Sequence, residues 1–476
     1  MSLFIRLACA EAMTTRQTEV LVIGAGPGGY VAAIRAAQLG KQVLCVEKEK
    51  LGGVCLNVGC IPSKALIHAA RTFRGIAHEA PDMGIEVSGA KIDLKKTQAW
   101  KRTVTTGLTN GIGQLFKANK VESLFGTATF TGPNTVTVAT KDGPVTVQFK
   151  SCILATGSRP VQVPGFAFGG NIVDSTAALD LEELPQRMVV IGGGFIGLEI
   201  GMAYAAMGAK VAVVEMMDQL LPGQDPEIVK LIERRCKKEG IQVFTKAKAK
   251  GYDGREVAIE MDGKEEKLPA DKVLVAVGRR PNTDALGLEK AGVQVGERGL
   301  IKVNEKGQTN VPHIFAIGDI VPGPALAHKA SKEGLVAAAV IAGDKGAALD
   351  YKALPWAIFV EPEVATVGLT EAQAREKGYE PVVSKFPYAA LGRAKSTNAT
   401  EGFVKVVADK KTDLLLGVHI VGAEASNLIA EAALAIEMGA TAMDLALTIH
   451  THPTFPEAIM EAAEGIHGKM VHAMNR

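Results

Sequence analysis

Two stretches of the chain repeat the same order of apolar, glycine and acidic positions. In the first, residues 19–23 (EVLVI) form a short apolar run that predicts a buried parallel strand. An apolar stretch over 30–39 predicts a helix, and 42–46 predict a second strand that ends in Glu47. Between strand and helix stand three spaced glycines, Gly24, Gly26 and Gly29. This order predicts a βαβ unit.

The second copy has the same parts in the same order. Residues 188–191 predict a strand, a helix follows through Met207, and a strand over 210–214 ends in Glu215. Its spaced glycines are Gly192, Gly194 and Gly197. A lone glycine motif is weak evidence, but two complete copies in one chain make a chance match improbable.

Each copy carries the fingerprint of a dinucleotide-binding turn. The first glycine permits the tight turn, the second lets the backbone approach a pyrophosphate, and the third allows close helix–strand packing. The helix N-terminus offers N–H groups to the phosphates, and the terminal carboxylate can bind a ribose diol. Because Met216, Met217 and Asp218 follow Glu215 where arginines would welcome a 2′-phosphate, we expect the second site to prefer NAD(H).

Length and composition fit an ordinary globular α/β enzyme of about three domains. The 476 residues are 47% hydrophobic, and 53 basic against 51 acidic residues leave a net charge of +2. Such a balance argues against nucleic acid or an acidic membrane as partner. There is no run of about 18 apolar residues, so no membrane-spanning helix is expected. Nine scattered histidines predict no metal site.

The first 16 residues precede the first clear strand. Arg6 interrupts their apolar stretch, which is the wrong charge pattern for a secretory signal. We expect a short disordered leader over residues 1–16, with an organellar presequence or a start at Met13 as alternatives.

Two cysteines lie close together in the stretch LGGVCLNVGCIPSK, residues 51–64. The other four cysteines are scattered, which disfavours a secreted disulfide scaffold and favours a reducing compartment. There, a close pair such as Cys55 and Cys60 is more often redox-active or metal-binding than structural. Because no second pair completes a zinc site, redox chemistry is the leading interpretation.

The cysteines sit where a helix is expected to begin. Cys60 precedes Ile61 and Pro62, and proline is tolerated in the first helical turn. A thiolate at a helix start is favoured by the helix dipole, and Lys64 on the same face would add positive charge. Near the C-terminus, His450 and His452 offer a side chain whose pKa suits proton transfer at neutral pH. A surface loop or a structural hydrogen bond is the alternative for that pair.

These features together resemble the pyridine nucleotide–disulfide oxidoreductases, and within them the dihydrolipoamide dehydrogenase (E3) branch. The resemblance covers residues 17–476. It rests on motifs that are specific in combination and in order: Gly52–Lys64, Ile153–Ser158, Gly192–Glu199, Gly278–Asn282, Ile314–Asp319, Leu326–Lys329 and His450–Glu457.

The resemblance implies an α/β fold with two Rossmann-like dinucleotide-binding domains and a C-terminal α+β dimerisation domain. The implied order is a leader (1–16), an FAD-binding domain (17–157), an NAD-binding domain (158–283), a central domain that completes the FAD site (284–354) and an interface domain (355–476). The apolar helix over 426–438 agrees with a buried dimer interface.

The resemblance also assigns cofactor contacts residue by residue. For FAD these are Gly24, Gly26, Gly29, Glu47, Lys64, Ala128, Thr156, Gly157, Ser158, Asp319, Ala325, Leu326, Ala327 and His328. For NAD they are Gly192, Gly194, Gly197, Glu199, Glu215 and Gly278. Glu199 is expected to pair with Lys64 beside the flavin. From the residues alone, Asp319 fits a helix N-cap equally well.

The implied activity is oxidation of dihydrolipoamide by NAD⁺. Cys55 would exchange with substrate, Cys60 would face the flavin, His452 would act as base, and Glu457 would orient that base; His450 is assigned a structural role. The base would serve the disulfide of the other subunit of a homodimer. The implied partners are the lipoyl and subunit-binding domains of the E2 acyltransferase, in bacterial cytoplasm or, alternatively, the mitochondrial matrix.

Two other functions stay open. One is reduction of a different disulfide such as glutathione, which Glu215 and the Ile61–Lys64 stretch disfavour. Mercuric reductase and large thioredoxin reductase are disfavoured because the C-terminus lacks a vicinal cysteine pair. The second is a non-catalytic assembly protein, which the intact cysteine pair, base and nucleotide motifs argue against.

Overall fold

The structure is a computed structural model that describes residues 14–475. The chain divides into two compact units, and each is built from separate stretches of sequence. The first unit contains the described chain up to Ile61, together with Arg102–Arg159 and Arg279–Asp350. The second unit contains Pro62–Lys101, Pro160–Gly278 and the described chain from Tyr351 onward. The predicted α/β class is confirmed.

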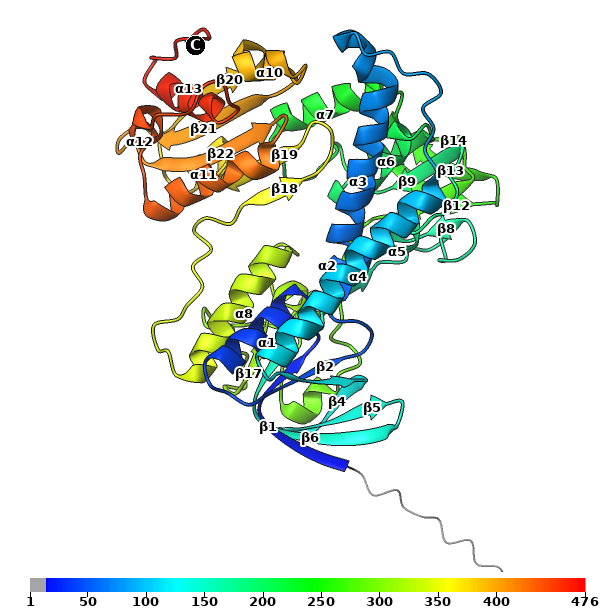
Figure 1. Cartoon of the computed structure of the whole chain (residues 1–476), viewed down its shortest axis with the longest axis vertical. Helices are drawn as coiled ribbons and strands as arrows, with labels where there is room; N and C mark the ends of the chain where they lie inside the picture. The colour runs from blue at the N-terminus through cyan, green and yellow to red at the C-terminus, as the bar shows by residue number, and fades with distance from the viewer. Residues whose placement is uncertain (1–13, 476) are drawn as a thin grey trace, which may run out of the picture. The chain divides into compact units, whose positions relative to one another are not determined.

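The first unit is built around one seven-stranded sheet (Figure 1). Its order is β3-β2-β1-β6-β5-β4, and β17 pairs with β6. The pairs of β1 with β2 and β6, of β2 with β3 and of β17 with β6 are parallel, whereas β4, β5 and β6 form an antiparallel meander. The strands are β1 (Thr14–Ile23), β2 (Val43–Glu47), β3 (Glu122–Phe125), β4 (Thr127–Gly132), β5 (Thr135–Thr140), β6 (Gly143–Leu154) and β17 (Ile314–Ala316).

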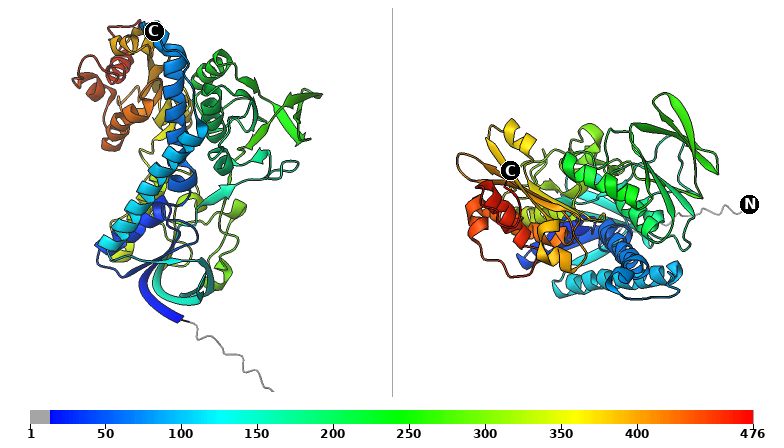
Figure 2. Two further views of the ribbon diagram at one scale, coloured as in Figure 1. Left: turned by 45° about the vertical axis from the view of Figure 1, so that its right-hand side comes forward. Right: turned by 90° about the horizontal axis from the view of Figure 1, so that it is seen from above.

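Two helices of this unit lie side by side in the views of Figures 1 and 2. They are α1 (Pro27–Gln38) and α8 (Ala327–Ala342). Val20, Leu21 and Val22 of β1 are fully buried, as expected for a central parallel strand covered on both faces. Helix α2 (Gly53–Val58) also belongs to this unit, whereas α3 (Cys60–Arg74) and α4 (Leu94–Ala118) run through both units.

The first strand corrects the expected leader. Residues 14–16, which the sequence placed in the leader, are the start of β1 because Thr14, Thr15 and Arg16 continue the parallel ladder opposite Val145, Thr146 and Val147. Residues 1–13 of the predicted leader lie outside the described residues.

The second unit holds a parallel sheet of order β11-β10-β9-β15-β8. An antiparallel ribbon, β12-β13-β14, follows β11 in the chain (green in Figure 2). The bounds are β8 (Ile172–Val173), β9 (Arg187–Ile191), β10 (Lys210–Val214), β11 (Gln242–Phe244), β12 (Ala247–Tyr252), β13 (Glu256–Met261), β14 (Lys264–Pro269) and β15 (Lys272–Val275), with helices α5 (Ser175–Ala178), α6 (Phe195–Ala206) and α7 (Pro226–Lys238). The short strands β7 (Ser158–Pro160) and β16 (Arg279–Pro281), which belong to the first unit except for Pro160, pair with each other.

The C-terminal part of the second unit is an antiparallel sheet of order β18-β19-β22-β21-β20. Helix α11 packs against β19 and β22, and α13 packs against β20 and β21 (Figure 1). The bounds are β18 (Trp356–Ile358), β19 (Val364–Gly368), β20 (Pro381–Pro387), β21 (Phe403–Asp409), β22 (Leu415–Val421), α9 (Glu371–Glu376), α10 (Gly392–Ser396), α11 (Ala425–Met438), α12 (Ala442–Leu447) and α13 (Glu457–Ile466).

One helical run, over residues 53–83, has the length and apolar composition of a membrane span. It is weak evidence, because core helices of soluble proteins pass the same test. The run also contains Lys64, Arg71 and Arg74, and each of these forms an ion pair with a glutamate.

The middle strands of the C-terminal sheet bury polar side chains. Every residue of β21 and β22 is buried, including Lys405 and His419. Lys405 forms ion pairs with Asp225 at 2.7 Å and with Glu227. His419 Nε2 lies 3.1 Å from the carbonyl oxygen of Leu369, and among the described residues Nδ1 has no hydrogen-bond partner. Burial lowers the pKa of His419, against the opposing effects of Leu369 and Asp225.

We predict that His419 makes the fold acid-sensitive. Its folded pKa lies below the unfolded value of about 6.5, so the unfolded chain takes up the proton first and stability falls as the pH drops below that value. Thermal unfolding at pH 7.5 and 5.5 should show a larger decrease in Tm for the native chain than for His419→Gln, whose amide can still donate to Leu369. Equal decreases would contradict the prediction.

Candidate active site

The three glycines of the first turn are of two kinds. At Gly24 and Gly29 a side chain would collide with backbone atoms, whereas at Gly26 it would meet open space. Gly24 has a φ of +100°, and a Cβ there would lie 2.3 Å from the carbonyl oxygen of Ala155. A Cβ on Gly29 would lie 1.8 Å from the carbonyl oxygen of Gly24. Gly26 has no atom within 4 Å of its Cβ position, and α1 begins directly after it at Pro27. The turn therefore leaves room for a ligand at the start of the helix.

The second turn repeats these relations at equivalent positions. Gly192 has a φ of +107°, and its Cβ would lie 2.5 Å from the carbonyl oxygen of Ala276. A Cβ on Gly197 would lie 2.3 Å from the carbonyl oxygen of Gly192, whereas Gly194 faces open space. Helix α6 begins after Gly194, so both units present a helix N-terminus beside an open glycine.

The carboxylates that end β2 and follow β10 are held in the same way. Glu47 and Glu215 are buried, and each carboxylate oxygen accepts one backbone N–H at 2.6–2.8 Å. The donors are Ala25 and Glu49 for Glu47, and Gly193 and Met217 for Glu215. A carboxylate oxygen has a second lone pair, so both side chains stay able to accept from ribose hydroxyls.

A polar chain connects three further residues of the first unit. Arg279 Nε donates to Ser158 Oγ at 2.8 Å, and Ser158 Oγ donates to Asp319 Oδ2 at 2.5 Å. Asp319 lies in a 3₁₀ turn over Gly318–Ile320. The hydrogen bond from Ser158 orients its carboxylate. Sequence reasoning singled out Ser158 and Asp319 but missed Arg279, although the GRRPN motif contains it.

The remaining predicted contacts lie on strand β4, at the start of helix α8 or in loops. Ala128 is buried on β4, Leu326 is the N-cap of α8, and Ala325 precedes it. Ala327 and His328 form the first turn of that helix, as expected. Thr156 donates to the carbonyl oxygen of Asn282 at 2.8 Å, while Gly157 and Gly278 have φ of +66° and +126°.

The two cysteines occupy different helices. Cys55 lies half-buried in α2, and Cys60 is the first residue of α3 and is exposed. The predicted helix start at Cys60 is therefore confirmed. Burial raises the pKa of the Tyr30 hydroxyl, and the charge of Cys55 adds to this effect.

The other cysteines in the described part of the chain are poor candidates for thiol chemistry. Cys45, Cys152 and Cys236 are buried, and burial raises the pKa of each thiol. A buried thiol with a raised pKa is a poor nucleophile. Cys9 lies outside the described residues.

An ion pair forms between Lys64 and Glu199, as the resemblance implied. Lys64 Nζ lies 2.8 Å from Glu199 Oε2, and the Glu199 side chain is buried. The other carboxylate oxygen accepts the backbone N–H of Phe359 at 2.8 Å. The Lys64 ammonium also lies 4.3 Å from the centroid of the Phe359 ring, within cation–π range. Sequence reasoning missed Phe359.

His452 and Glu457 form a dyad at the start of α13. His452 Nδ1 donates to Glu457 Oε1 at 2.8 Å, and Glu457 Oε2 accepts the backbone N–H of Thr454 at 2.7 Å. Burial alone would raise the pKa of the Glu457 carboxyl, but the Thr454 N–H and the His452 ring outweigh it and lower that pKa. The His452 side chain is 77% exposed, so Nε2 is the ring nitrogen left for a substrate proton.

The second histidine of this loop has a different environment. His450 is 6% exposed, with Nδ1 2.8 Å from the carbonyl oxygen of Thr448 and Nε2 2.8 Å from Glu431 Oε1. Both ring nitrogens are therefore engaged. These contacts fasten the loop to α11, which agrees with the structural role assigned to His450.

Two sequence profiles of known families match the chain. Residues 18–334 match the profile described as pyridine nucleotide-disulphide oxidoreductase, and residues 354–463 match the dimerisation domain of the same group. The chain belongs to the pyridine nucleotide-disulphide oxidoreductases.

Curated members of this family are similar over nearly their whole length. Dihydrolipoyl dehydrogenase of Geobacillus stearothermophilus is 52% identical over 464 residues, which cover 97% of this chain and 98% of the relative. The protein of the same name from Haloferax volcanii is 50% identical, with 96% and 98% covered. Among solved structures, LpdA of Mycobacterium tuberculosis has a TM-score of 0.87 at 27% identity, covering 94% of this chain and 99% of that one. The flavoprotein disulfide reductase RclA of Escherichia coli gives 0.84 at 27% identity, with the same coverage.

Family membership makes the protein an oxidoreductase that uses FAD and NAD(H). The two turns fit such groups, since Gly26 and Gly194 leave open space at helix starts and the buried Glu47 and Glu215 keep lone pairs for ribose. The match over 354–463 supports a homodimer.

Two glycine variants should separate folding from FAD binding. Gly29→Ala would press a Cβ against the Gly24 carbonyl and should destabilise the protein by about 3 kcal/mol. Gly26→Ala meets no atom and should leave the Tm of the flavin-free protein unchanged or slightly higher. It should nevertheless weaken FAD binding by about tenfold or more, because the methyl group occupies the space through which a pyrophosphate approaches.

Thermal unfolding of the flavin-free variants and fluorescence titration with FAD measure the two effects. Equal loss of stability in both variants would contradict the assignment of Gly26 to the ligand side of the turn.

Proposed function

We propose that this protein oxidises dihydrolipoamide to lipoamide with NAD⁺ as the acceptor, as the E3 component of 2-oxo acid dehydrogenase complexes. The observation that carries the proposal is the cysteine pair at the junction of α2 and α3, in a chain that also holds two dinucleotide turns and the His452–Glu457 dyad. The name dihydrolipoyl dehydrogenase borne by relatives about half identical to it supports the same substrate.

The thiol half-reaction follows from the properties of the side chains. His452 Nε2 accepts the proton of one substrate thiol, while Glu457 holds the ring by Nδ1 and stabilises the imidazolium. The substrate thiolate attacks Sγ of Cys55, which breaks the Cys55–Cys60 disulfide and releases Cys60 as a thiolate. The second substrate thiol then displaces Cys55, so the substrate loses two electrons and the disulfide gains them.

The position of Cys60 favours its role as the leaving thiolate. It begins the 15-residue helix α3, where the N-terminal end of the dipole stabilises negative charge. FAD, when bound, would supply the hydride chemistry that connects this thiolate to NAD⁺. We assign the FAD contacts to the first turn, Glu47, Ser158 and Asp319, and the NAD contacts to the second turn and Glu215.

The proposal extends to partners and place of action. We propose that His452 serves the disulfide of the other subunit of the homodimer, and that E2 lipoyl and subunit-binding domains are the partners. Bacterial relatives of the same name support action in the cytoplasm. The mitochondrial matrix is the alternative compartment.

Anaerobic mixing with dihydrolipoamide tests the substrate directly. A long-wavelength thiolate–flavin absorption band should form and then decay as NADH appears on addition of NAD⁺. Cys55→Ser should abolish this reaction, because no sulfur remains to form the mixed disulfide. If NADH reduces the flavin but dihydrolipoamide does not, the thiol substrate is wrong and glutathione would be tried next. A non-catalytic assembly protein would keep its role in vivo with Cys55→Ser.

Replacing the base should impair only the thiol half-reaction. His452→Gln should lower the rate of dihydrolipoamide oxidation about a hundredfold or more at neutral pH, because the substrate thiol loses its proton acceptor. Reduction of an artificial electron acceptor by NADH needs no such base and should keep its native rate. A similar loss in both assays would show that the variant damages the fold or the flavin site instead.

A further inference from the structure

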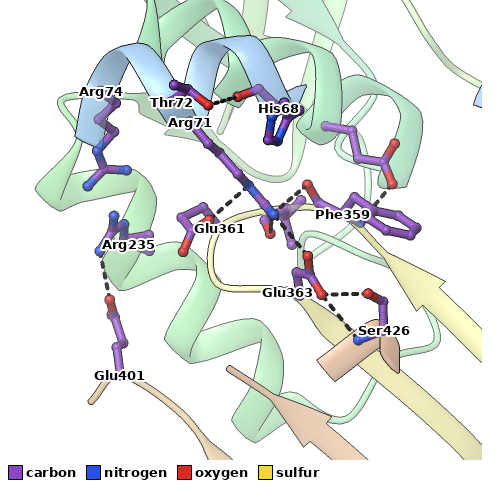
Figure 3. Close-up of polar contacts among 12 residues, drawn as sticks. His68, Arg71, Thr72, Arg74, Arg235, Phe359, Glu361, Glu363, Glu401 and Ser426 are labelled. Atoms are coloured by element: carbon purple, nitrogen blue, oxygen red, sulfur yellow. Dashed lines mark hydrogen bonds and ion pairs between the residues drawn. The ribbon is translucent and has the colours of Figure 1, made fainter. Parts of the chain in front are cut away.

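The segment Phe359–Glu363 connects β18 to β19, and Arg71 of α3 binds it through hydrogen bonds and ion pairs (Figure 3). Arg71 Nε lies 2.9 Å from Glu361 Oε2, and Nη1 lies 2.9 Å from Glu363 Oε1. Nη2 donates to the carbonyl oxygens of Val360 at 2.8 Å and Phe359 at 3.2 Å. All three nitrogens of the guanidinium group thus contact this segment.

The first residue of the segment contacts both members of the ion pair between Lys64 and the buried Glu199. The backbone N–H of Phe359 donates to Glu199 Oε1, while the ring of Phe359 lies under the Lys64 ammonium. The position of this one residue therefore fixes the carboxylate from one side and the ammonium from another. Any shift of the segment would loosen both contacts.

The last residue of the segment is fastened separately. Glu363 Oε2 accepts the hydroxyl of Ser426 at 2.7 Å and its backbone N–H at 3.1 Å, in the first turn of α11 (Figure 3). A carboxylate at a helix N-terminus is favoured by the dipole and by the unsatisfied N–H groups. Glu363 thus fixes the C-terminal end of the segment to α11. Arg71 binds both Glu363 and the backbone carbonyls of Phe359 and Val360.

We propose that Arg71 is a positioning residue for the Lys64–Glu199 pair, because it clamps the segment that places Phe359 against both. The inference rests on the proposed function, in which Lys64 faces the flavin. A guanidinium group suits this task because its planar fork reaches several acceptors at fixed angles, which an ammonium cannot do. Burial raises the pKa of Glu361, and the Arg71 charge opposes that rise.

Another arginine of the second unit offers a control for loss of charge. Arg235 of α7 is 9% exposed and its Nη1 lies 2.9 Å from Glu401 Oε2. Figure 3 shows that this ion pair is separate from the Arg71 contacts. Arg235 Nε also lies 3.0 Å from Glu239 Oε1, and the Arg235 charge, like that of Arg71, opposes the rise that burial causes in the pKa of Glu361. Arg235→Met therefore removes a charge that also acts on Glu361 but leaves the hydrogen bonds between Arg71 and the segment in place.

The experiment compares full-length, FAD-loaded variants by the visible absorption spectrum of the flavin and by stopped-flow reduction with NADH. Lys64→Met serves as the reference for loss of the ammonium. Arg71→Met should shift the flavin spectrum in the same direction as Lys64→Met but less far, and should slow reduction about two- to fivefold. Arg71→Lys should lie between Arg71→Met and the native protein, and Arg235→Met should match the native protein.

Phe359→Leu keeps the backbone N–H but removes the ring, so it should also shift the spectrum toward that of Lys64→Met. If Arg71→Met fails to fold, Phe359→Leu provides the test, because it removes the contact between the Phe359 ring and Lys64 without removing the Arg71 charge. A native spectrum for Phe359→Leu and Arg71→Met, with a shifted one for Lys64→Met, would overturn this inference alone. A native spectrum for Lys64→Met would overturn the placement of Lys64 at the flavin and the inference together.

Discussion

Backbone crowding at two glycine turns is the constraint on which the nucleotide units depend. The third glycine of each turn, Gly29 or Gly197, brings its helix so close that a single methyl group would meet the carbonyl of the first glycine. Such contact aims the helix N-terminus at the place where the second glycine leaves open space. The same turn supplies the backbone N–H that fixes Glu47 or Glu215. One close approach thus sets both the open helix N-terminus and the buried carboxylate of each turn, the two features that a dinucleotide site requires.

In the second unit, buried and partly buried carboxylates are each held by several partners. Glu199 and Glu363 each accept hydrogen bonds at both carboxylate oxygens, so neither leaves a desolvated oxygen unpaired. These contacts form one continuous path from Lys64 to Ser426 at the start of α11. The same helix carries Glu431, which contacts His450 and so fastens the loop that also contains His452. Helix α11 therefore supports both the segment next to the ion pair and the loop that carries His452.

The sequence predicted the local elements well because their signals are local. The strands and helices of both βαβ units were predicted within a few residues, and the helix start at Cys60 followed from Pro62. The start of β1 was missed because Thr14–Arg16 have no apolar alternation, and pairing with β6 decides their conformation. Arg71 and Phe359 were missed for a related reason. Their contacts join residues 288 positions apart, and no spacing in the sequence reveals such a pair.

The two histidines near the C-terminus show what only the packing could decide. In the sequence they are neighbours of one type, and the choice of His452 as base came from the resemblance alone. In the structure, both ring nitrogens of His450 are engaged and its side chain is 6% exposed, whereas His452 uses one nitrogen and is 77% exposed. A base must receive a proton from a substrate that reaches it from solvent. His450 has no ring nitrogen left for such a proton, whereas Nε2 of His452 is accessible, and this difference favours His452 as the proposed base.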